Sequence, residues 1–248
     1  MVWPPQRADL FLVQHGYFET RAKAQAAIAA GGVTADGVVI SKPSQKIADG
    51  AAVVAEAAHP YVSRAALKLV AGLDAFQIDP AGKTCLDVGA STGGFTQVLL
   101  ERGATRVHAV DVGHGQLHPD VAGDPRVLNL EGQDARTLDA TRIGEPPALI
   151  VCDASFIGLA KVLERPLGLA ADTCDLVALI KPQFEVGREN LHKKGIVRDA
   201  AARESAIAAV RRWLDGRSGF QVRGMIESPI TGGDGNVEFL ITARKQGL

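Results

Sequence analysis

Five near-continuous apolar runs constrain the fold more than any other feature of this chain. They are TCLDV (84–88), RVHAVDV (106–112), RVLNL (126–130), ALIVCD (148–153) and LVALIK (176–181). Strands that are buried on both faces of a parallel sheet have this composition. Helical patterns, notably at 93–103 and 157–171, separate several of the runs. The chain therefore predicts an α/β fold with a mostly parallel sheet.

The C-terminal part predicts a hairpin at one side of this sheet. A long helical pattern at 199–216 precedes two further strand patterns, GFQVRGMIES (219–228) and NVEFLITARK (236–245). Only a glycine-rich turn joins these two strands, so we expect them to pair antiparallel. The prediction for the larger part of the chain is a Rossmann-like fold, closed by an antiparallel hairpin.

The first sixty residues follow a different pattern and predict a separate α+β unit. Two short helices are expected, and Thr20 is a natural N-cap for the second of them. Asp36-Gly37 interrupts an apolar run and predicts a hairpin turn. We expect a small domain at 1–57, a linker at 58–62, and a large domain at 63–248 that opens with a helix capped by Ser63.

Composition excludes several classes of protein. Lys plus Arg number 27 against 28 Asp plus Glu, so any contact with nucleic acid must come from local patches. No window approaches the roughly 18 uncharged apolar residues of a membrane helix, and the N-terminus is not a signal peptide. Cys85, Cys152 and Cys174 lack C-x-x-C spacing. We expect buried reduced thiols, no metal, no membrane partner and a cytoplasmic location.

The segment CLDVGASTGGFT (85–96) predicts a strand, a tight turn and a helix, which is typical of a cofactor loop. A phosphate-binding P-loop would need Lys-Ser/Thr after its glycines, and a dinucleotide loop would need glycine at 91. S-adenosylmethionine has no phosphate and fits better. Asp87 suits its amino group, directly or through water, Asp111 its ribose hydroxyls, and Asp134 its adenine amino group.

Polar residues at the strand ends predict a second cluster. Asp153 and Lys181 end two apolar runs, and Glu238 begins the last strand, which is antiparallel. These three side chains meet on one rim if their strands are neighbours. Lys68, on the preceding helix, is a candidate second cation. Such a cluster suits the deprotonation of a poor acid, with lysine as the base.

Several motifs together resemble a known family. The segment from Arg7 to Ile47 resembles the S-four-type RNA-binding module. The motifs YVSRAALKL, DVGASTGGFT, DASF, LIKPQFEVGRE and SPITGGDGNVEFL resemble the TlyA (hemolysin A) family. Members of that family are similar to FtsJ-like ribosomal RNA 2′-O-methyltransferases, which use S-adenosylmethionine.

This resemblance implies a catalytic tetrad of Lys68, Asp153, Lys181 and Glu238, with Lys181 as the base. It also implies a cofactor loop in which Ser91 replaces the usual glycine, and we expect Ser91 to contact the methionine carboxylate. The expected cofactor residues are Asp87, Gly89, Ser91, Gly93, Gly94, Phe95, Asp111 and Asp134.

Basic residues are the expected contacts to RNA phosphates. They are Arg7, Arg21, Lys23, Lys42, Lys46, Arg64, Arg188, Lys193 and Lys194. The expected partners are ribosomal RNA or ribosomal subunits, and a monomer is favoured. Two alternatives stay open: a catalytically inactive RNA-binding protein, and a membrane-active hemolysin. The absence of an apolar span or a basic amphipathic helix disfavours the second alternative, and the missing glycine disfavours an oxidoreductase.

Overall fold

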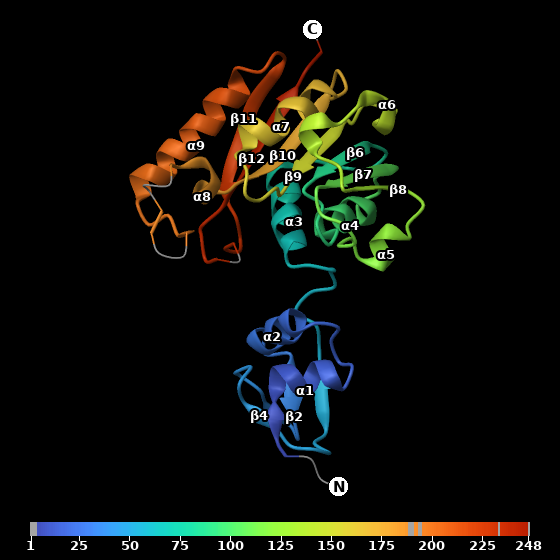
Figure 1. Cartoon of the computed structure of the whole chain (residues 1–248), viewed down its shortest axis with the longest axis vertical. Helices are drawn as coiled ribbons and strands as arrows, with labels where there is room; N and C mark the ends of the chain where they lie inside the picture. Colours follow the sequence, from blue (N-terminus) through green and yellow to red (C-terminus); the bar gives the residue numbers. More distant parts are fainter. Residues whose placement is uncertain (1–3, 188–190, 193–194, 233, 248) are drawn as a thin grey trace. The chain divides into compact units, whose positions relative to one another are not determined.

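The computed structural model describes residues 4–187, 191–192, 195–232 and 234–247. It divides into two compact units, Met1–Pro60 and Tyr61–Leu248 (Figure 1). The division falls inside the segment 58–62. Short sequence patterns precede this segment, and long apolar runs follow it.

The smaller unit is a pair of helices packed on short strands. Its elements are β1 (Gln6–Arg7), α1 (Ala8–Gln14), α2 (Arg21–Ala29), β2 (Val33–Ala35), β3 (Val38–Val39), β4 (Lys46–Ile47) and β5 (Val53–Ala55). Thr20 caps α2 by accepting a hydrogen bond from the Lys23 amide, as predicted. Asp36 and Gly37 both have positive φ, of 50° and 78°, so the predicted hairpin turn is confirmed. The β1–β4 ribbon was not predicted, because two-residue strands carry no periodicity.

The larger unit contains a seven-stranded sheet with the order β11-β12-β10-β9-β6-β7-β8. Its strands are β6 (Thr84–Val88), β7 (Arg106–Asp111), β8 (Val127–Glu131), β9 (Leu149–Cys152), β10 (Cys174–Ile180), β11 (Phe220–Glu227) and β12 (Phe239–Lys245). Strands β10, β9, β6, β7 and β8 are parallel, and β12 is antiparallel to both β10 and β11. The predicted fold class is therefore confirmed, including the hairpin.

Helices cover both faces of this sheet (Figure 1). They are α3 (Ala65–Phe76), α4 (Gly94–Glu101), α5 (Pro119–Ala122), α6 (Ala140–Ile143), α7 (Leu159–Gly168), α8 (Pro182–Glu185) and α9 (Ala200–Asp215), with a 3₁₀ turn, η1 (Ala135–Thr137). Leucines and valines of α3 and α4 form one core with the sheet. Those of α7 and α9 form a second core on the opposite face.

Ser63 does not cap α3, which corrects one prediction. The helix begins one residue later, with Arg64 at the N-cap position and no side-chain cap. The Ser63 hydroxyl instead lies against Gly94, where an added Cβ would come within 2.4 Å of it. Ser63 therefore packs against α4 and does not cap α3.

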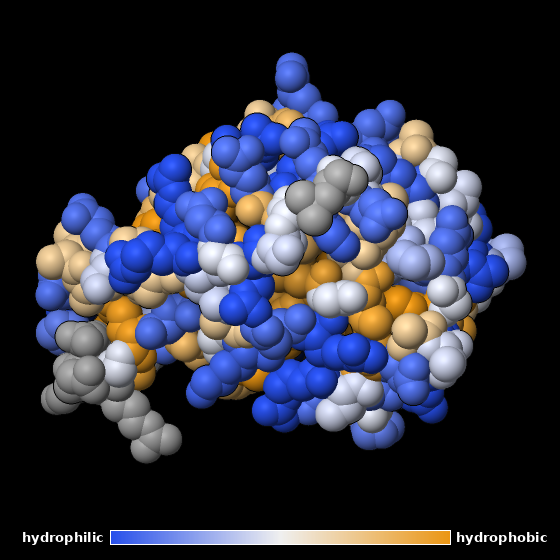
Figure 2. All heavy atoms as spheres, turned by 90° about the horizontal axis from the view of Figure 1, so that it is seen from above, coloured by the Kyte–Doolittle hydropathy of each residue, from blue (hydrophilic) through white to orange (hydrophobic). Residues whose placement is uncertain are grey.

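Cys85, Cys152 and Cys174 are free and buried, as expected. On the face shown in Figure 2, hydrophilic side chains predominate and apolar ones are interspersed among them. No helix in the described ranges is long and apolar enough to cross a membrane.

Gly89 fixes the turn that leaves β6. Its φ is 82°, and a Cβ there would lie 2.9 Å from both the Ala154 amide nitrogen and its Cα. Both obstacles are backbone atoms, so a side chain cannot be accommodated by a rotamer change. Glycine at 89 therefore allows the turns after β6 and β9 to approach each other.

We expect Gly89→Ala to lower the free energy of unfolding by about 1–3 kcal/mol, because it combines overpacking with an unfavourable φ. Gly168→Ala is the matched control, since an added Cβ at that helical position meets nothing within 4 Å. The control should leave stability unchanged or raise it by up to about 1 kcal/mol. Urea denaturation of both variants measures the difference, and equal stabilities would contradict this account.

Candidate active site

Two lysines and two carboxylates meet at the carboxyl edge of the sheet. Asp153 follows β9, Lys181 follows β10, Glu238 precedes β12, and Lys68 lies on α3. Lys68 Nζ is 2.6 Å from Glu238 Oε2 and 3.8 Å from Asp153 Oδ2. Lys181 Nζ is 2.7 Å from Asp153 Oδ1. The structure thus brings together all four residues of the predicted cluster.

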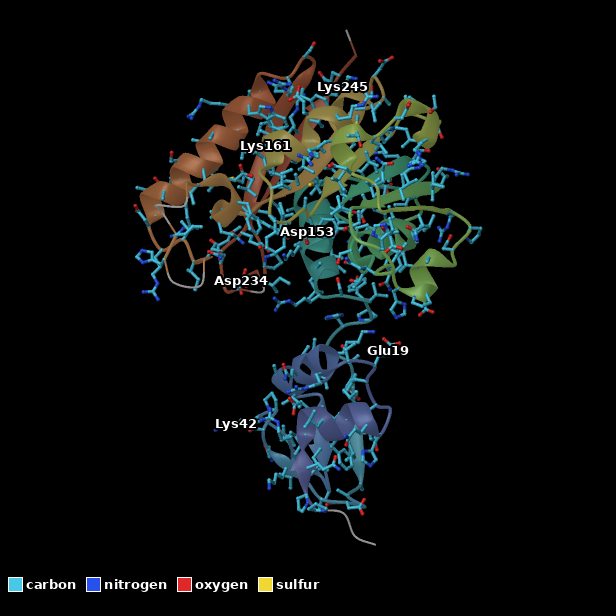
Figure 3. All side chains as sticks on the ribbon, viewed as in Figure 1. Glu19, Lys42, Asp153, Lys161, Asp234 and Lys245 are labelled. Atoms are coloured by element: carbon cyan, nitrogen blue, oxygen red, sulfur yellow. The ribbon has the colours of Figure 1, made fainter. Side chains whose placement is uncertain are left out.

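The register of the sheet explains why these side chains meet. Ile180 pairs with Phe239 across β10 and β12, so the next positions, Lys181 and Glu238, leave the sheet at the same edge. Figure 3 shows Asp153 at this edge, while Lys245, at the end of β12, lies at the opposite edge. The antiparallel direction of β12 is what allows its first residues to join the ends of parallel strands.

Opposite charges alternate through this buried cluster, in the order Glu238, Lys68, Asp153, Lys181. Lys68, Lys181 and Glu238 are each less than a tenth exposed. Burial of an unpaired charge is strongly unfavourable, and each member here has a neighbour of opposite sign. The arrangement keeps two amines close together without a net charge in the interior.

Lys181 is held by more than its ion pair. Its Nζ also donates to the Asp153 carbonyl oxygen at 3.1 Å and contacts the Ser155 hydroxyl at 2.7 Å. Three oxygens therefore fix one end of a flexible side chain. The contact with Ser155 was not predicted from the sequence, because a serine in a short loop carries no pattern of its own.

A cavity of about 1060 Å³ extends along the ends of β6, β7 and β8, and Asp153 is the member of the cluster that lines it. Four of the predicted cofactor residues line it: Gly89, Ser91, Asp111 and Asp134. Asp111 accepts hydrogen bonds from the Ser91 amide at 2.8 Å and the Gly113 amide at 2.7 Å. These two bonds hold the carboxylate at the end of β7, beside the turn that follows β6.

Ser91 and Asp134 adopt conformations that the sequence did not indicate. Ser91 has a φ of 47°, in the left-handed region where glycine is favoured. Asp134 pairs with Arg136 at 2.6 Å, and the hydrogen bond from that guanidinium lowers the pKa of the carboxyl group. The carboxylate therefore stays ionised at the wall of the cavity.

The other four predicted cofactor residues, Asp87, Gly93, Gly94 and Phe95, are not among the residues that line the cavity. Phe95 belongs to the core beneath α4. Gly93 is the N-cap of α4 and lies against Leu117 and Val121, which leave no room for a side chain. Gly94 lies against Ser63, so both glycines serve the packing of the turn.

Asp87 is buried below the cofactor loop. Its Oδ2 accepts a hydrogen bond from the Thr96 hydroxyl at 2.7 Å, while its Oδ1 has no hydrogen-bond partner in the described chain. Burial raises the pKa of this carboxyl group to about 7. An unpartnered buried oxygen of this kind is unfavourable unless a ligand or a water molecule satisfies it.

Phe156 is a feature of the site that sequence analysis missed. Its side chain is 91% exposed and its φ is 66°, although a bulky residue rarely adopts the left-handed region. Its ring lies 5.2 Å from the ring of Phe184, at an angle of 49°. Both residues line the cavity beside the tetrad, so an aromatic surface stands next to the four charged groups.

In the smaller unit, two of the predicted RNA contacts share one buried carboxylate. Asp9 is fully buried and accepts hydrogen bonds from Arg7, Arg21 and Gln25. The bond from Arg7 holds the pKa of Asp9 far below its usual range. Both guanidiniums remain about half exposed, so they are held in place yet free to bind a further anion.

The remaining predicted RNA contacts are more scattered. Lys23 pairs with Glu19 at 2.6 Å. Lys42, Lys46 and Arg64 are exposed. The last three predictions, Arg188, Lys193 and Lys194, lie outside the residues that the structure describes.

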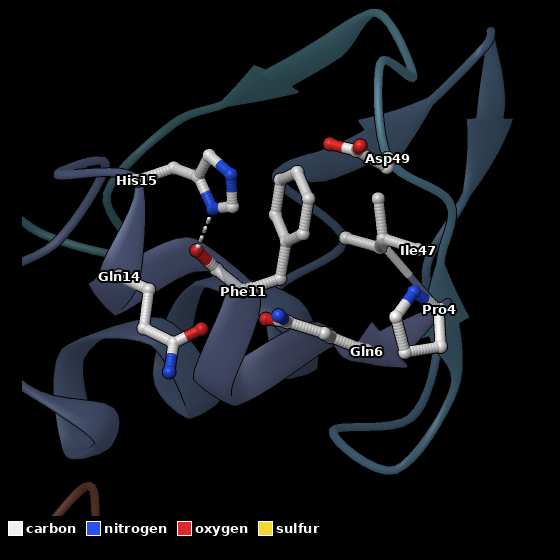
Figure 4. A pocket seen from close by; sticks show the side chains of 7 residues that line it. All are labelled: Pro4, Gln6, Phe11, Gln14, His15, Ile47 and Asp49. Atoms are coloured by element: carbon white, nitrogen blue, oxygen red, sulfur yellow. Dashed lines mark hydrogen bonds between the residues drawn. The ribbon is translucent and has the colours of Figure 1, made fainter. Parts of the chain in front are cut away.

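The smaller unit also has a cavity of its own, of about 320 Å³. In this cavity the His15 ring stacks on Phe11 with a centroid distance of 3.8 Å, and His15 Nδ1 lies 2.9 Å from the Phe11 carbonyl oxygen (Figure 4). The cavity is separate from the charged cluster, which belongs to the larger unit.

The doubly wound sheet, the glycine turn after β6 and the acids at the strand ends define a methyltransferase domain, here preceded by a small α+β domain. Comparison with known proteins agrees with this class. Residues 61–245 match the FtsJ-like methyltransferase family, and residues 6–53 match the S4 domain.

The chain belongs to the TlyA family of FtsJ-like methyltransferases. It is 45% identical to the 16S/23S rRNA (cytidine-2′-O)-methyltransferase TlyA of Mycobacterium tuberculosis, over 97% of this chain and 90% of that one. It is 39% identical to Hemolysin A of Brachyspira hyodysenteriae, over 94% and 98% of the two chains.

A solved structure from Streptococcus thermophilus that carries the hemolysin name has the same fold. It superimposes with a TM-score of 0.76 at 39% identity, and the match covers 98% of this chain and 89% of that one. The resemblance noted from the sequence motifs is thus confirmed at the level of the family.

The alternating charges generate a prediction about stability. Glu238→Gln keeps the shape of the side chain but leaves Lys68 with only the more distant Asp153, so we expect unfolding free energy to fall by about 3 kcal/mol. Adding Lys68→Met removes the orphaned charge and should restore most of that loss. Chemical denaturation of both single variants and the double variant measures the coupling. Strictly additive effects would show that the two side chains do not form a pair.

Proposed function

We propose that this protein transfers a methyl group from S-adenosylmethionine to a ribose 2′-hydroxyl of ribosomal RNA. The observation that carries the proposal is the buried cluster of Lys68, Asp153, Lys181 and Glu238 beside a large cavity. The relative from Mycobacterium tuberculosis is named for this reaction. A ribosomal RNA substrate supports the proposal of a cytoplasmic location.

The residues around the cavity fit the proposed cofactor. Asp111 would accept hydrogen bonds from the ribose hydroxyls, and Asp134 would accept a hydrogen bond from the adenine amino group. The unpartnered Oδ1 of Asp87 suits the cationic amino group, reached through water because Asp87 does not itself line the cavity. When bound, S-adenosylmethionine supplies a methyl group that its sulfonium activates for transfer.

Lys181 is the proposed general base. A ribose hydroxyl is too weak an acid to ionise at neutral pH, so a base must take its proton as the new bond forms. The Lys181 amine is held by oxygens of Asp153 and Ser155, two residues that line the cavity. Lys68 lies close to Asp153 on one side and is held by Glu238 on the other.

Phe156 and the smaller unit are the proposed contacts to RNA. An aromatic ring held in solvent beside the tetrad offers a surface on which an unstacked base can lie. Arg7 and Arg21, oriented by Asp9, would bind RNA phosphates. The intact tetrad favours an enzyme over an inactive RNA-binding protein.

The pKa of Asp87 generates a prediction about cofactor binding. In the free protein its pKa of about 7 leaves Asp87 largely neutral below pH 7. A bound cation favours the ionised form, so binding should release a proton, and affinity should rise with pH up to about 7. Calorimetry at pH 6.5 in buffers with different ionisation enthalpies measures the proton. If the Asp87→Asn variant still released a proton on binding the cofactor, that proton would come from another group.

The assignment of Lys181 generates a second prediction. Lys181→Met keeps the length of the side chain and removes the amine, so turnover should fall by about 10² or more while cofactor affinity stays nearly unchanged. Lys181→Arg should fail almost as badly, because a guanidinium does not release its proton near neutral pH. The assay is methyl transfer to ribosomal RNA from cells that lack the protein, with the ribose methylation mapped.

Two outcomes would contradict these proposals in different ways. Near-normal turnover of Lys181→Arg would make Lys181 an electrostatic contact and pass the role of base to Asp153 or Glu238. If the wild-type protein methylated no ribose, the proposed reaction itself would be wrong.

A further inference from the structure

Ser155 connects the proposed base to the cavity. Lys181 is only 7% exposed, and it is not among the described residues that line the cavity. Ser155 is exposed and does line it. The Ser155 hydroxyl lies 2.7 Å from Lys181 Nζ. A substrate in the cavity therefore has access to the serine, whereas the amine lies behind the cavity wall.

The loop that carries Ser155 is held in place by the turn after β6. The Asp153 amide donates a hydrogen bond of 3.1 Å to the Val88 carbonyl oxygen. The Ala154 backbone packs so closely on Gly89 that a Cβ on the glycine would come within 2.9 Å of it. The backbone that leads to Ser155 is thus fixed next to the proposed cofactor loop.

The three oxygens around Lys181 Nζ differ in what they can do. The Asp153 carbonyl oxygen, at 3.1 Å, and the ionised carboxylate oxygen of Asp153, at 2.7 Å, can only accept a hydrogen bond. The Ser155 hydroxyl can either accept or donate. An ammonium group has three N–H donors and suits all three oxygens. A neutral amine has two N–H groups and a lone pair, and of these three partners only Ser155 can donate to the lone pair.

We propose that Ser155 relays the proton of the ribose 2′-hydroxyl to Lys181. This inference rests on the proposed function and adds a catalytic residue to it. The 2′-hydroxyl proton passes to Ser155 Oγ while the Ser155 proton passes to the lone pair of Lys181 Nζ. At the end of the step Ser155 is again a neutral hydroxyl, and Lys181 is an ammonium group.

The step is balanced in atoms and in charge. As the ribose O–H bond breaks, the ribose oxygen uses an electron pair to bond to the methyl carbon. The sulfur keeps the electron pair of the broken carbon–sulfur bond and changes from a sulfonium to a neutral thioether. One positive charge is lost there and one appears on Lys181, where the Asp153 carboxylate is already its partner.

The first test removes the Ser155 hydroxyl and follows single-turnover methyl transfer to ribosomal RNA from cells that lack the protein. Ser155→Ala should lower the rate by about 10², as expected for loss of a positioned proton-transfer group. Ser155→Thr keeps a hydroxyl at the same place and should keep most of the rate. Ser218→Ala, at an exposed serine in the turn before β11, is the matched control and should match wild type.

The double variant tests whether the serine and the lysine act as one unit. In Lys181→Met the relayed proton has no acceptor, so adding Ser155→Ala should lower the rate no further. A serine that only bound substrate would cost the same factor in both backgrounds. Cofactor affinity and Tm of Ser155→Ala should match those of wild type, which separates a lost relay from misfolding.

Rates in mixtures of light and heavy water distinguish a relay from a residue that only positions Lys181. Serine and ribose hydroxyls are both very weak acids, so the two protons must move together. The wild-type rate should therefore follow a curve as the deuterium fraction rises. In Ser155→Ala at most one proton moves, and the dependence should be linear. A serine that only positioned the amine would give a linear dependence in wild type as well.

A linear or absent dependence in wild type would overturn the relay, whatever the variants do. A near-normal rate of Ser155→Ala, or additive losses in the double variant, would also overturn it. In each of these cases ribose methylation by the wild-type protein continues, and the proposed function stands. Absence of any ribose methylation by the wild-type protein would overturn the proposed function itself before any serine is changed.

Discussion

The active-site edge depends on the pairing of two buried amines with two buried carboxylates. Each side chain has a neighbour of opposite sign, and removing one partner would leave the other buried without its pair. Because the charges alternate, removing any one member changes the surroundings of the next. The cluster therefore behaves as one unit, and the proposed catalytic roles of its members are not separable from their contributions to stability.

The topology of the sheet alone brings most of the charged cluster together. Strands β9 and β10 are parallel neighbours, so the chain leaves both at the same edge. Strand β12 enters there because it runs the other way. The turn after β6 approaches the same edge, and Gly89 allows it to pass next to Ala154. The cavity and the charged cluster thus share Asp153, because their residues come from neighbouring strand ends.

Most of this arrangement could be predicted from the sequence because it depends on strand ends. Asp111, Asp153, Lys181 and Glu238 interrupt apolar runs at positions where a buried strand must stop, and topology then brings them to one edge. Features set by local backbone conformation could not be predicted. Phe156 looks like an ordinary core aromatic in the sequence, and only its φ of 66° directs it into solvent.

Contacts that depend on side-chain packing could not be predicted from the sequence either. Gly93 and Gly94 resemble ligand-binding glycines, yet neighbouring side chains explain them, since Leu117, Val121 and Ser63 occupy the space that a Cβ would need. Asp87 was assigned correctly to the strand end before the loop, but its depth beneath that loop depends on how α4 packs. Pattern indicates which edge a residue reaches, and packing determines how far it lies from the surface.

The hydrogen bond between Lys68 and Glu238 joins residues 170 positions apart. During synthesis, Lys68 leaves the ribosome long before its carboxylate partner exists. The nascent chain can complete the S4 domain and begin the parallel sheet, but the cluster of Lys68, Asp153, Lys181 and Glu238 stays incomplete until β12 has been synthesised.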